Sequence, residues 1–478
     1  MDHASSVSRP QRGARTPSNS RLSDDGLPAD VARARHPSRA QRVRRSGPLV
    51  ACYILWVLIL GDPLRWVAYY GARPILQIPT ALLIVTLIGT ALSHRMRFIP
   101  PLVAFALYAV LSVPVAYNIG YAIPVAKVLT SYCGLAILTV TVVRTAREAV
   151  PIVVWGLLFQ YTWWTLVGAI PGHVFWHTLA YNNYDSFGPM MAIALGSSYF
   201  MALSVKERNL KIIAFATTGG CIIGLISSYA RGAVVAGVAT LICMFLRSKN
   251  KLRTAGLAIA GAVVVFFATN VLFTNASRED ANPNFWIEMS TIADTGGTRR
   301  DRDELRAVAR IEWRQNPIFG VGPGNFGPYA AEELSNGQLE GIRSDPGRLY
   351  TKALHNMFYQ ILSEFGTVGV LIFLWLLWDF SKRNRALRKR DSIDIWASRT
   401  GGQFDLRNVS LALEAGMVGY LVSGYFYNQI FDVNWFYSLI TINTLLFQVT
   451  RPALAHNSRL PHFRLRGEQI TGHKPRLA

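Results

Sequence analysis

Residues 352–378 read KALHNMFYQILSEFGTVGVLIFLWLLW, and this stretch decides how the rest of the chain is interpreted. It ends in an apolar run long enough to cross the hydrocarbon core of a membrane, which takes about 20 residues. It opens with the imidazole of His355 and carries the carboxylate of Glu364 before the purely apolar part. Because an isolated carboxylate is costly in a membrane, we expect Glu364 to have a structural partner on a neighbouring helix or in a loop.

Long apolar runs of this kind recur along the chain and define its class. The protein has 478 residues, of which 51% are hydrophobic and 16% are charged. This composition is typical of a polytopic integral membrane protein. We predict an all-α fold with about 12 transmembrane helices. The predicted spans are about 49–69, 75–93, 98–117, 121–143, 149–170, 186–205, 210–228, 231–246, 253–273, 356–379, 409–427 and 433–450.

The distribution of positive charge predicts the orientation. A formal net charge of +21 would suit a nucleic-acid-binding protein. Most of the 49 Lys and Arg residues, however, lie in the terminal segments and in gaps on one side of the predicted spans. Such gaps mark cytoplasmic loops, so we predict cytoplasmic N- and C-termini and no nucleic-acid partner. The basic gaps are 93–97, 143–148, 206–211, 247–253 and 381–407.

The topology divides the chain into five segments. Residues 1–47 are predicted to be a disordered basic cytoplasmic tail that anionic lipid head groups attract. Residues 48–273 hold the first nine spans, and 274–354 form one large extracytoplasmic loop. Residues 355–450 hold the last three spans, and 451–478 form a basic cytoplasmic tail.

The large loop contains an arginine-rich helix in TRRDRDELRAVARIEWRQNPIFGVGPGNF, residues 298–326. A helix is predicted over 301–316, ending before Pro317. Four arginines, Arg302, Arg306, Arg310 and Arg314, recur every four residues, and such like-charge pairs destabilise a helix. The offsetting anion is either Asp303 and Glu312, lipid phosphates, or a bound pyrophosphate, which guanidinium groups grip with bidentate hydrogen bonds.

The glycines after this helix, Gly320, Gly322 and Gly324, superficially resemble a nucleotide-binding loop. A dinucleotide fingerprint follows a strand, whereas a helix precedes these residues, so that interpretation is rejected. A tight turn beside a substrate path fits them better.

Several polar features converge on the outer side. These are Arg231 in SSYARGA, the arginine helix, His355 with Asn356, and Asn183 in the entry to the sixth span. An arginine at a span end often anchors lipid head groups, and a histidine there is often interfacial. Imidazole is nevertheless the side chain best suited to proton transfer near neutral pH. No carboxylate pair or His/Cys spacing typical of a metal site accompanies it, and we expect no metal or other cofactor.

Helical geometry predicts how these residues relate to one another. On an ideal helix Tyr359 lies one turn from His355 on the same face, whereas Glu364 lies nearly opposite. His355 and Glu364 are therefore not expected to form a dyad.

NPIFGVGPGNF (316–326) followed by HNMFYQILSEFGTVGVLIFL (355–374) resembles the superfamily of O-antigen ligases and O-antigen or exopolysaccharide polymerases. SSYARGA (227–233) is similar to its outward-facing Ser-x-x-Arg element, and NNYDSFG (182–188) to its entry into the sixth span. The resemblance implies a GT-C-like membrane glycosyltransferase of the bacterial inner membrane, acting in lipopolysaccharide or exopolysaccharide biosynthesis.

The resemblance also implies roles for individual residues. His355 would be the catalytic or acceptor-orienting histidine, while Arg231 and Arg302, with Arg299 and Arg300 as alternatives, would bind the diphosphate. Asn183, Gly322, Asn356, Tyr359 and Glu364 would support them. The family often has Trp four residues after its loop arginine, where this chain has Arg306. The implied reaction is a metal-independent, inverting transfer of a glycan from an undecaprenyl-pyrophosphate carrier to a glycan or lipid A–core acceptor.

Two functions other than ligase or polymerase remain open on the sequence. Ligase and polymerase differ only in the acceptor, and a protein O-oligosaccharyltransferase would differ again. A transporter or flippase of a lipid-linked or anionic saccharide would use the same arginines without making a glycosidic bond. The absence of a repeat signal counts against a transporter, as does the scarcity of charge near mid-membrane, with Lys127 in the fourth span as an exception.

Overall fold

The computed structural model describes residues 39–60, 77–169, 184–228, 230–252, 254–256, 259–261, 263, 297–337, 339, 346–350, 354–428 and 434–451. The chain divides into two compact units, Met1–Gly47 and Pro48–Ala478, and the second unit holds the predicted spans. Its regular secondary structure, within the described ranges, is helical apart from one isolated bridge between Val205 and Phe404.

The helices follow the predicted intervals closely. They are α2 (Arg39–Leu60), α4 (Ile78–Ser93), α5 (Pro100–Ser112), α6 (Ile119–Val142), α7 (Ala146–Val154), η2 (Trp155–Phe159), α8 (Gln160–Ala169), α10 (Tyr184–Ser204), α11 (Arg208–Ser227), α12 (Arg231–Arg247), α15 (Gly297–Gln315), α16 (Phe326–Ser335), α17 (Pro346–Tyr350), α18 (Met357–Leu387), α19 (Arg390–Thr400), α20 (Leu406–Gly424) and α21 (Asn434–Thr450). Each predicted span overlaps at least one helix except 253–273, most of which lies outside the described residues. The span 149–170 is divided among α7, η2 and α8. Helix α2 begins at Arg39, inside the segment 1–47 that was predicted to be disordered, and residues 61–69 of the first span lie outside the described residues.

Several helices have the length and composition of membrane spans. Among the described residues, 5 helices are long and apolar enough to cross a membrane, and three shorter apolar helices accompany them. These findings indicate a multi-pass membrane protein. The total of about 12 spans stays a prediction.

The core of the second unit is built around α10. This helix packs against α20, α11 and α12, and 94% of its apolar window Phe187–Ser204 is buried. Small residues let its backbone approach α20 closely, because a Cβ atom on Gly419 would lie 2.8 Å from the carbonyl oxygen of Ala192. Such close approach is the usual means of helix association in membranes, where lipid is as apolar as the side chains.

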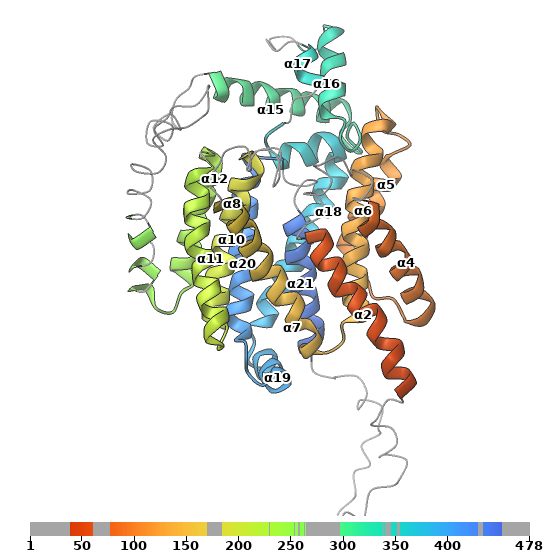
Figure 1. Cartoon of the computed structure of the whole chain (residues 1–478). Coiled ribbons are helices and arrows are strands. Elements are labelled where there is room, and N and C mark those ends of the chain that lie inside the picture. The colour runs from red at the N-terminus through yellow and green to blue at the C-terminus, as the bar shows by residue number, and fades with distance from the viewer. Residues whose placement is uncertain are drawn as a thin grey trace, which may run out of the picture. The chain divides into compact units, whose positions relative to one another are not determined.

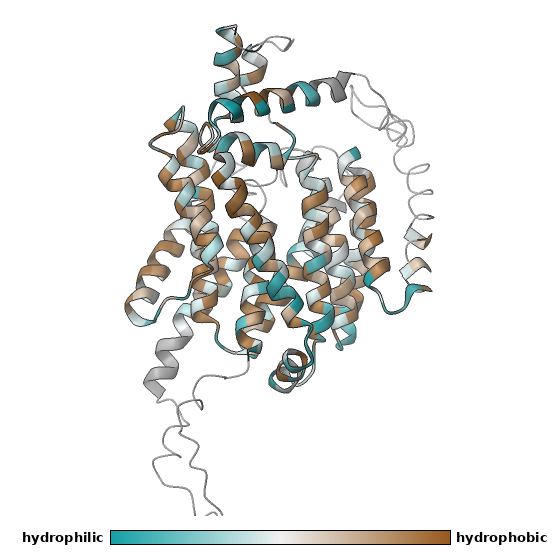
Figure 2. Ribbon diagram, turned by 180° about the vertical axis from the view of Figure 1, so that it is seen from behind, coloured by the Kyte–Doolittle hydropathy of each residue, from teal (hydrophilic) through white to brown (hydrophobic). Residues whose placement is uncertain are grey.

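Helical elements outside the spans lie at two opposite ends of the unit (Figure 1). At one end α15, α16 and α17 share a small apolar cluster to which Leu305, Phe326 and Leu349 contribute. At the other end, α18 continues to Leu387 and is followed by α19, so the predicted basic linker is largely helical. Figure 2 shows hydrophobic residues between these ends and hydrophilic residues on α15 and α19.

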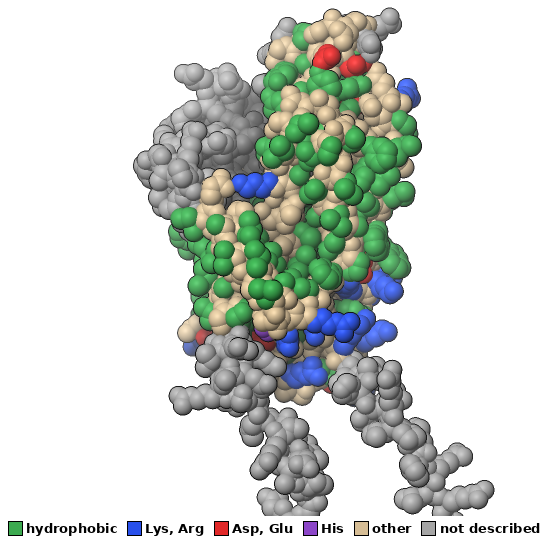
Figure 3. All heavy atoms as spheres, turned by 90° about the vertical axis from the view of Figure 1, so that its right-hand side faces the viewer, with side chains coloured by type: hydrophobic (Ala, Val, Ile, Leu, Met, Phe, Trp, Pro, Cys, Tyr) green, Lys and Arg blue, Asp and Glu red, His purple; other side chains and the backbone are tan. Residues whose placement is uncertain are grey.

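Positive charge gathers at the α19 end. Figure 3 shows Lys and Arg side chains concentrated there, with a mainly hydrophobic belt above them. Among the described residues, Arg247 and Arg388 pair with the carboxylate of Glu414 on α20, at 2.5 and 2.6 Å. The charge asymmetry predicted from the sequence is thus present in three dimensions.

Candidate functional site

The helix α18, which follows His355, is broken near its beginning. Gly366 has φ 63° and ψ −164°, which no residue inside a helix adopts. A break in a helix leaves backbone carbonyl and amide groups without helical partners, and in a membrane these groups must be satisfied by protein. The glycine-rich segment 316–325 satisfies them.

The hydrogen bonds across the break come from both sides. The amides of Val321 and Gly322 donate to the carbonyl oxygens of Ser363 and Glu364, at 2.9 and 3.0 Å. In return the amide of Thr367 donates to the carbonyl oxygen of Pro317 at 2.9 Å. The predicted tight turn is therefore confirmed, and it fills the gap in α18.

The left-handed backbone of this turn explains its glycines. Gly320, Gly322 and Gly324 have φ values of 71°, 96° and 72°, a region that residues with a Cβ atom rarely adopt. A Cβ atom at Gly320 would also lie 2.5 Å from the carbonyl carbon of Glu364. The turn can dock into the break because these three positions carry no side chain.

Glu364 has the structural partner that the sequence predicts. Its side chain is buried, and its Oε2 atom accepts a hydrogen bond from the amide of Gly324 at 2.8 Å. Gln360, one turn earlier, donates to Oε1 at 3.5 Å. Glu364 thus fixes the turn to α18 from inside the protein.

His355 lies just outside α18. It has φ 52° and is the one non-glycine residue with positive φ among the described residues. Such a conformation costs about 1–3 kcal/mol and persists where the surroundings impose it, often at functional sites. The expectation that His355 and Tyr359 share a helical face is wrong, because the helix begins only at Met357. Tyr359 packs instead against the apolar cluster of the loop helices.

Asn356 imposes the conformation of its neighbour. It is the N-cap of α18, and its Oδ1 atom accepts hydrogen bonds from the amides of Phe358 and Tyr359 at 3.0 and 3.1 Å. Its Nδ2 donates to the carbonyl oxygen of Tyr425 at 2.9 Å, and its amide donates to Oδ1 of Asn428 at 3.1 Å. The backbone beside His355 is thereby held to the end of α20.

The segment 425–428 at the end of α20 also contacts the beginning of α12, where Arg231 lies. Gly232, the residue after Arg231, packs so closely on this segment that an added Cβ atom would clash with Phe426. Ala233, on the same turn of α12, touches the position of Gly188 near the start of α10. The beginnings of α12 and α18 thus adjoin one short segment, and Arg231 is half-buried there.

The loop helix α15 reaches the same segment through Arg306. The guanidinium carbon of Arg306 lies 4.9 Å from the ring centroid of Tyr425, and its side chain pairs with Asp303 at 3.1 Å. Its Nε atom is buried and donates no hydrogen bond within the described part of the chain. From the sequence, Arg306 was expected only as one of the four arginines for which a bound pyrophosphate was a possible partner, and it was given no individual role.

Of the other arginines predicted to bind the diphosphate, the structure describes the side chain of Arg302 but not those of Arg299 and Arg300. Arg302 lies one turn before Arg306 on α15 and is half-buried. The side chains of Arg299 and Arg300, and the whole of Asn183, lie outside what the structure describes. Helix α15 ends at Gln315, directly before Asn316 and Pro317, as predicted.

Glu312, on the same helix, is an unusual carboxyl group. Its side chain is fully buried, and neither carboxyl oxygen has a hydrogen-bond partner among the described residues. Burial, together with the charges of Glu364 and Glu333, raises the pKa of Glu312 well above its ordinary value. The raised pKa disfavours the charged form of Glu312. Among the described residues its carboxyl group pairs with none of the arginines of α15, so the expectation that it offsets their charges is not met.

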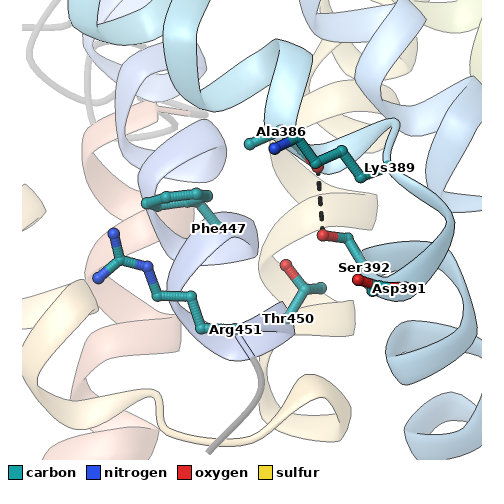
Figure 4. A pocket seen from close by; sticks show the side chains of 7 residues that line it. All are labelled: Ala386, Lys389, Asp391, Ser392, Phe447, Thr450 and Arg451. Atoms are coloured by element: carbon teal, nitrogen blue, oxygen red, sulfur yellow. Dashed lines mark hydrogen bonds between the residues drawn. The ribbon is translucent and has the colours of Figure 1, made fainter. Parts of the chain in front are cut away.

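A cavity of about 410 Å³ lies at the opposite end of the unit (Figure 4). Phe447, Thr450 and Arg451 of the α21 end form one wall, and Lys389 and Ser392 lie on the other. Ser392 donates a hydrogen bond to the carbonyl oxygen of Ala386 at 3.1 Å. The cavity shares no residue with the elements around His355 and is not part of the candidate site.

A comparison with known families supports the interpretation of this region. Residues 216–374 match the family described as O-antigen ligase, whereas no curated protein matches the chain. The matched stretch contains Arg231, the loop helices and His355. Members of this family are in general membrane glycan ligases or polymerases with lipid-linked glycan substrates. The family indicated by the sequence motifs is therefore confirmed, and residues 216–374 of this chain form an O-antigen ligase domain.

Proposed function

We propose that this protein transfers a glycan from an undecaprenyl-pyrophosphate carrier to a glycan or lipid A–core acceptor. The observation that carries the proposal is the convergence on segment 425–428. There the residues next to Arg231 and His355 and the guanidinium group of Arg306 contact four consecutive residues. Cationic side chains beside a strained histidine suit a reaction that displaces a diphosphate.

The chemical step is a single displacement. The acceptor hydroxyl oxygen attacks the anomeric carbon of the donor sugar while His355 accepts the hydroxyl proton. The bond between the anomeric carbon and the phosphate oxygen breaks, and undecaprenyl pyrophosphate leaves with the electron pair. Arg231 and Arg302 stabilise the negative charge that develops on the diphosphate, and Arg306 assists them. Attack from the face opposite the leaving group inverts the anomeric centre.

The remaining site residues organise this machinery. Asn356 fixes the backbone beside His355, and Glu364 with Gly322 holds the turn against α18. The site lies at the end of the unit that is opposite the basic α19 end. Because basic residues favour the cytoplasmic side, the site faces the periplasm.

The experiment is glycan transfer in vesicles that contain the purified protein and a lipid-linked donor. Removal of a general base lowers a rate by roughly 100- to 10,000-fold, and this loss is expected for His355→Ala. Removal of one charge-stabilising donor lowers it by roughly 100- to 1,000-fold, which is expected for Arg231→Ala. Arg310→Ala is the matched control, because Arg310 is exposed on the same loop helix as Arg302. Wild-type transfer by both active-site variants would refute the proposal.

The product separates this function from transport. A transferase releases free undecaprenyl pyrophosphate and forms a new glycosidic bond, whereas a transporter changes only the side on which the donor lies. Gel analysis of glycans from a deletion strain then identifies the acceptor. Loss of all capped lipid A indicates a ligase, caps of a single repeat indicate an O-antigen polymerase, and loss of secreted polysaccharide indicates an exopolysaccharide polymerase.

A further inference from the structure

A second hollow lies on the membrane-facing side of α4, α5 and α6, away from the residues of the proposed reaction. It has a volume of about 530 Å³, within the range of roughly 300–1,000 Å³ that is usual for ligand sites. Figure 3 looks onto the side of the unit where these helices lie and shows it to be mainly hydrophobic. The apolar walls of the hollow include Leu83, Ile84, Leu87, Val110, Val113 and Ile123.

One charged residue, Lys127 of α6, lines this apolar hollow. It lies six residues after Tyr121, an exposed aromatic residue near the start of α6, and thus about 9 Å further along the helix axis. Aromatic residues of this kind mark the membrane interface, so the Cα atom of Lys127 lies at the depth of lipid chains. A lysine at that depth is costly unless its charge reaches the interface or a partner.

The structure gives Lys127 a hydrogen-bond partner but no negatively charged partner among the described residues. The Nζ atom of Lys127 donates a hydrogen bond to Oε1 of Gln77 at 2.7 Å, at the start of α4. Gln77 is neutral, and no carboxylate pairs with Lys127 within the described ranges. The Nζ atom of Lys127 thus lies at the edge of an apolar hollow whose lining, among the described residues, includes no acidic side chain.

We propose that this hollow is a binding site for an anionic phospholipid. The phosphate group pairs with Lys127, and one acyl chain lies along the apolar walls formed by α4, α5 and α6. Charge complementarity selects the phosphate, because basic pockets between membrane helices bind anionic head groups. A zwitterionic lipid carries its own cation and gains less from the lysine.

Residues close in the chain to the lining of the hollow contact the turn that fills the break in α18. Val125, which directly precedes the lining residue Ala126, lies next to the position of Gly324. Ala116, two residues after the lining residue Pro114, lies next to the position of Gly322. A lipid bound in the hollow would thus brace the helices on which the turn rests. This role requires no glycan transfer, so the proposal stands or falls independently of the proposed reaction.

The experiment is native mass spectrometry of the purified full-length protein with added phosphatidylglycerol or phosphatidylcholine. The wild type should retain phosphatidylglycerol preferentially. Lys127→Ala should weaken that retention by about fivefold, the effect of one cation near a lipid head group, and leave phosphatidylcholine binding unchanged. Lys127→Arg should keep the preference, and Lys251→Ala, at an exposed lysine elsewhere, is the control.

Two results would overturn the proposal. One is equal retention of phosphatidylglycerol by the wild type and Lys127→Ala. The other is displacement of phosphatidylglycerol by an equimolar polyprenyl phosphate, since the site would then belong to a carrier lipid. Thermal unfolding of each variant verifies that it is folded, and Lys127→Gln, which keeps a polar side chain, replaces Lys127→Ala if the latter is not.

Discussion

Single residues carry the chemistry of this protein, and Glu312 shows how strongly burial changes one of them. Its pKa is raised above the ordinary value of 4.5 because the carboxyl group is desolvated and faces Glu364 and Glu333. Tyr329 of α16, which faces the same region, has a raised pKa as well. A raised pKa in the folded state means that the stabilising contribution is complete below the ordinary pKa and is lost as the pH rises through the folded pKa.

We therefore expect the wild-type unfolding temperature to fall, as the pH rises above the ordinary pKa of 4.5, more steeply than that of Glu312→Gln. Glutamine keeps the size of the neutral acid and cannot ionise. The measurement is thermal unfolding in detergent across this range, with Glu304→Gln as a control at a residue that is only half-buried. Parallel curves for the wild type and Glu312→Gln would show that Glu312 does not ionise in this range.

The sequence predicted some site residues better than others. His355, Asn356 and Glu364 lie in one contiguous motif, and the cost of a carboxylate in an apolar run sufficed to predict a partner for Glu364. Arg306 was not singled out from the four-arginine stripe, because its position depends on Tyr425, more than 100 residues later in the chain. The left-handed backbone at His355 was missed because the sequence placed His355 and Asn356 at the start of the helix, whereas the helix starts at Met357.

At the scale of elements, the break in α18 and the turn that fills it depend on each other. Gly366 combines a positive φ with a position where a Cβ atom would clash with the backbone of Ile318 and Gly320. Gly401, the residue that ends α19, also has a positive φ of 66° but has open space around it. A side chain at Gly401 would meet backbone strain alone, whereas a side chain at Gly366 would meet both backbone strain and a steric clash.

Gly401→Ala should lower the free energy of unfolding by about 1–2 kcal/mol, the cost of a left-handed residue with a side chain. Gly366→Ala should lower it further and should also expose the loop to protease, because the turn can no longer dock. Thermal unfolding and limited proteolysis of the two variants measure this difference. Equal effects would mean that the turn does not depend on close contact with α18.

The positions of the helices were largely predictable, and the break was not. Apolar runs fix where helices begin and end to within a few residues, as α6, α10 and α21 illustrate. A glycine inside an apolar run is common in membrane helices, so Gly366 carried no signal of a break. The helix α19 was also missed, because its basic sequence was interpreted only as a cytoplasmic gap.

At the scale of the whole molecule, the separation of charge predicts sidedness. Ser335 is exposed at the end of α16, and Ser398 is exposed on α19 at the basic end. A cysteine at position 335 should react in intact spheroplasts with a thiol reagent that does not cross membranes. A cysteine at position 398 should react only after the membrane is permeabilised, because the basic end is expected to face the cytoplasm.

Unsubstituted protein is the control for this labelling, since Cys52, Cys133 and Cys221 are buried and Cys243 is half-buried. Reaction at position 398 in intact spheroplasts would reverse the orientation and move His355 to the cytoplasmic side. The class of fold follows from composition alone. The number of spans does not, because α4, α5 and the apolar part of α2, Gly47–Leu60, are too short to be assigned by length and apolarity.

The docking of segment 316–325 into α18 has a consequence for how such enzymes diversify. The outer loop and the membrane helix share backbone hydrogen bonds in both directions, so neither surface is an independent module. A chimera that grafts the loop of a relative onto this scaffold must therefore carry residues 357–368 along with it. Recombination points inside residues 357–368 would separate segments that hydrogen-bond to each other, whereas points beyond Val368 would keep these hydrogen bonds within one parent sequence.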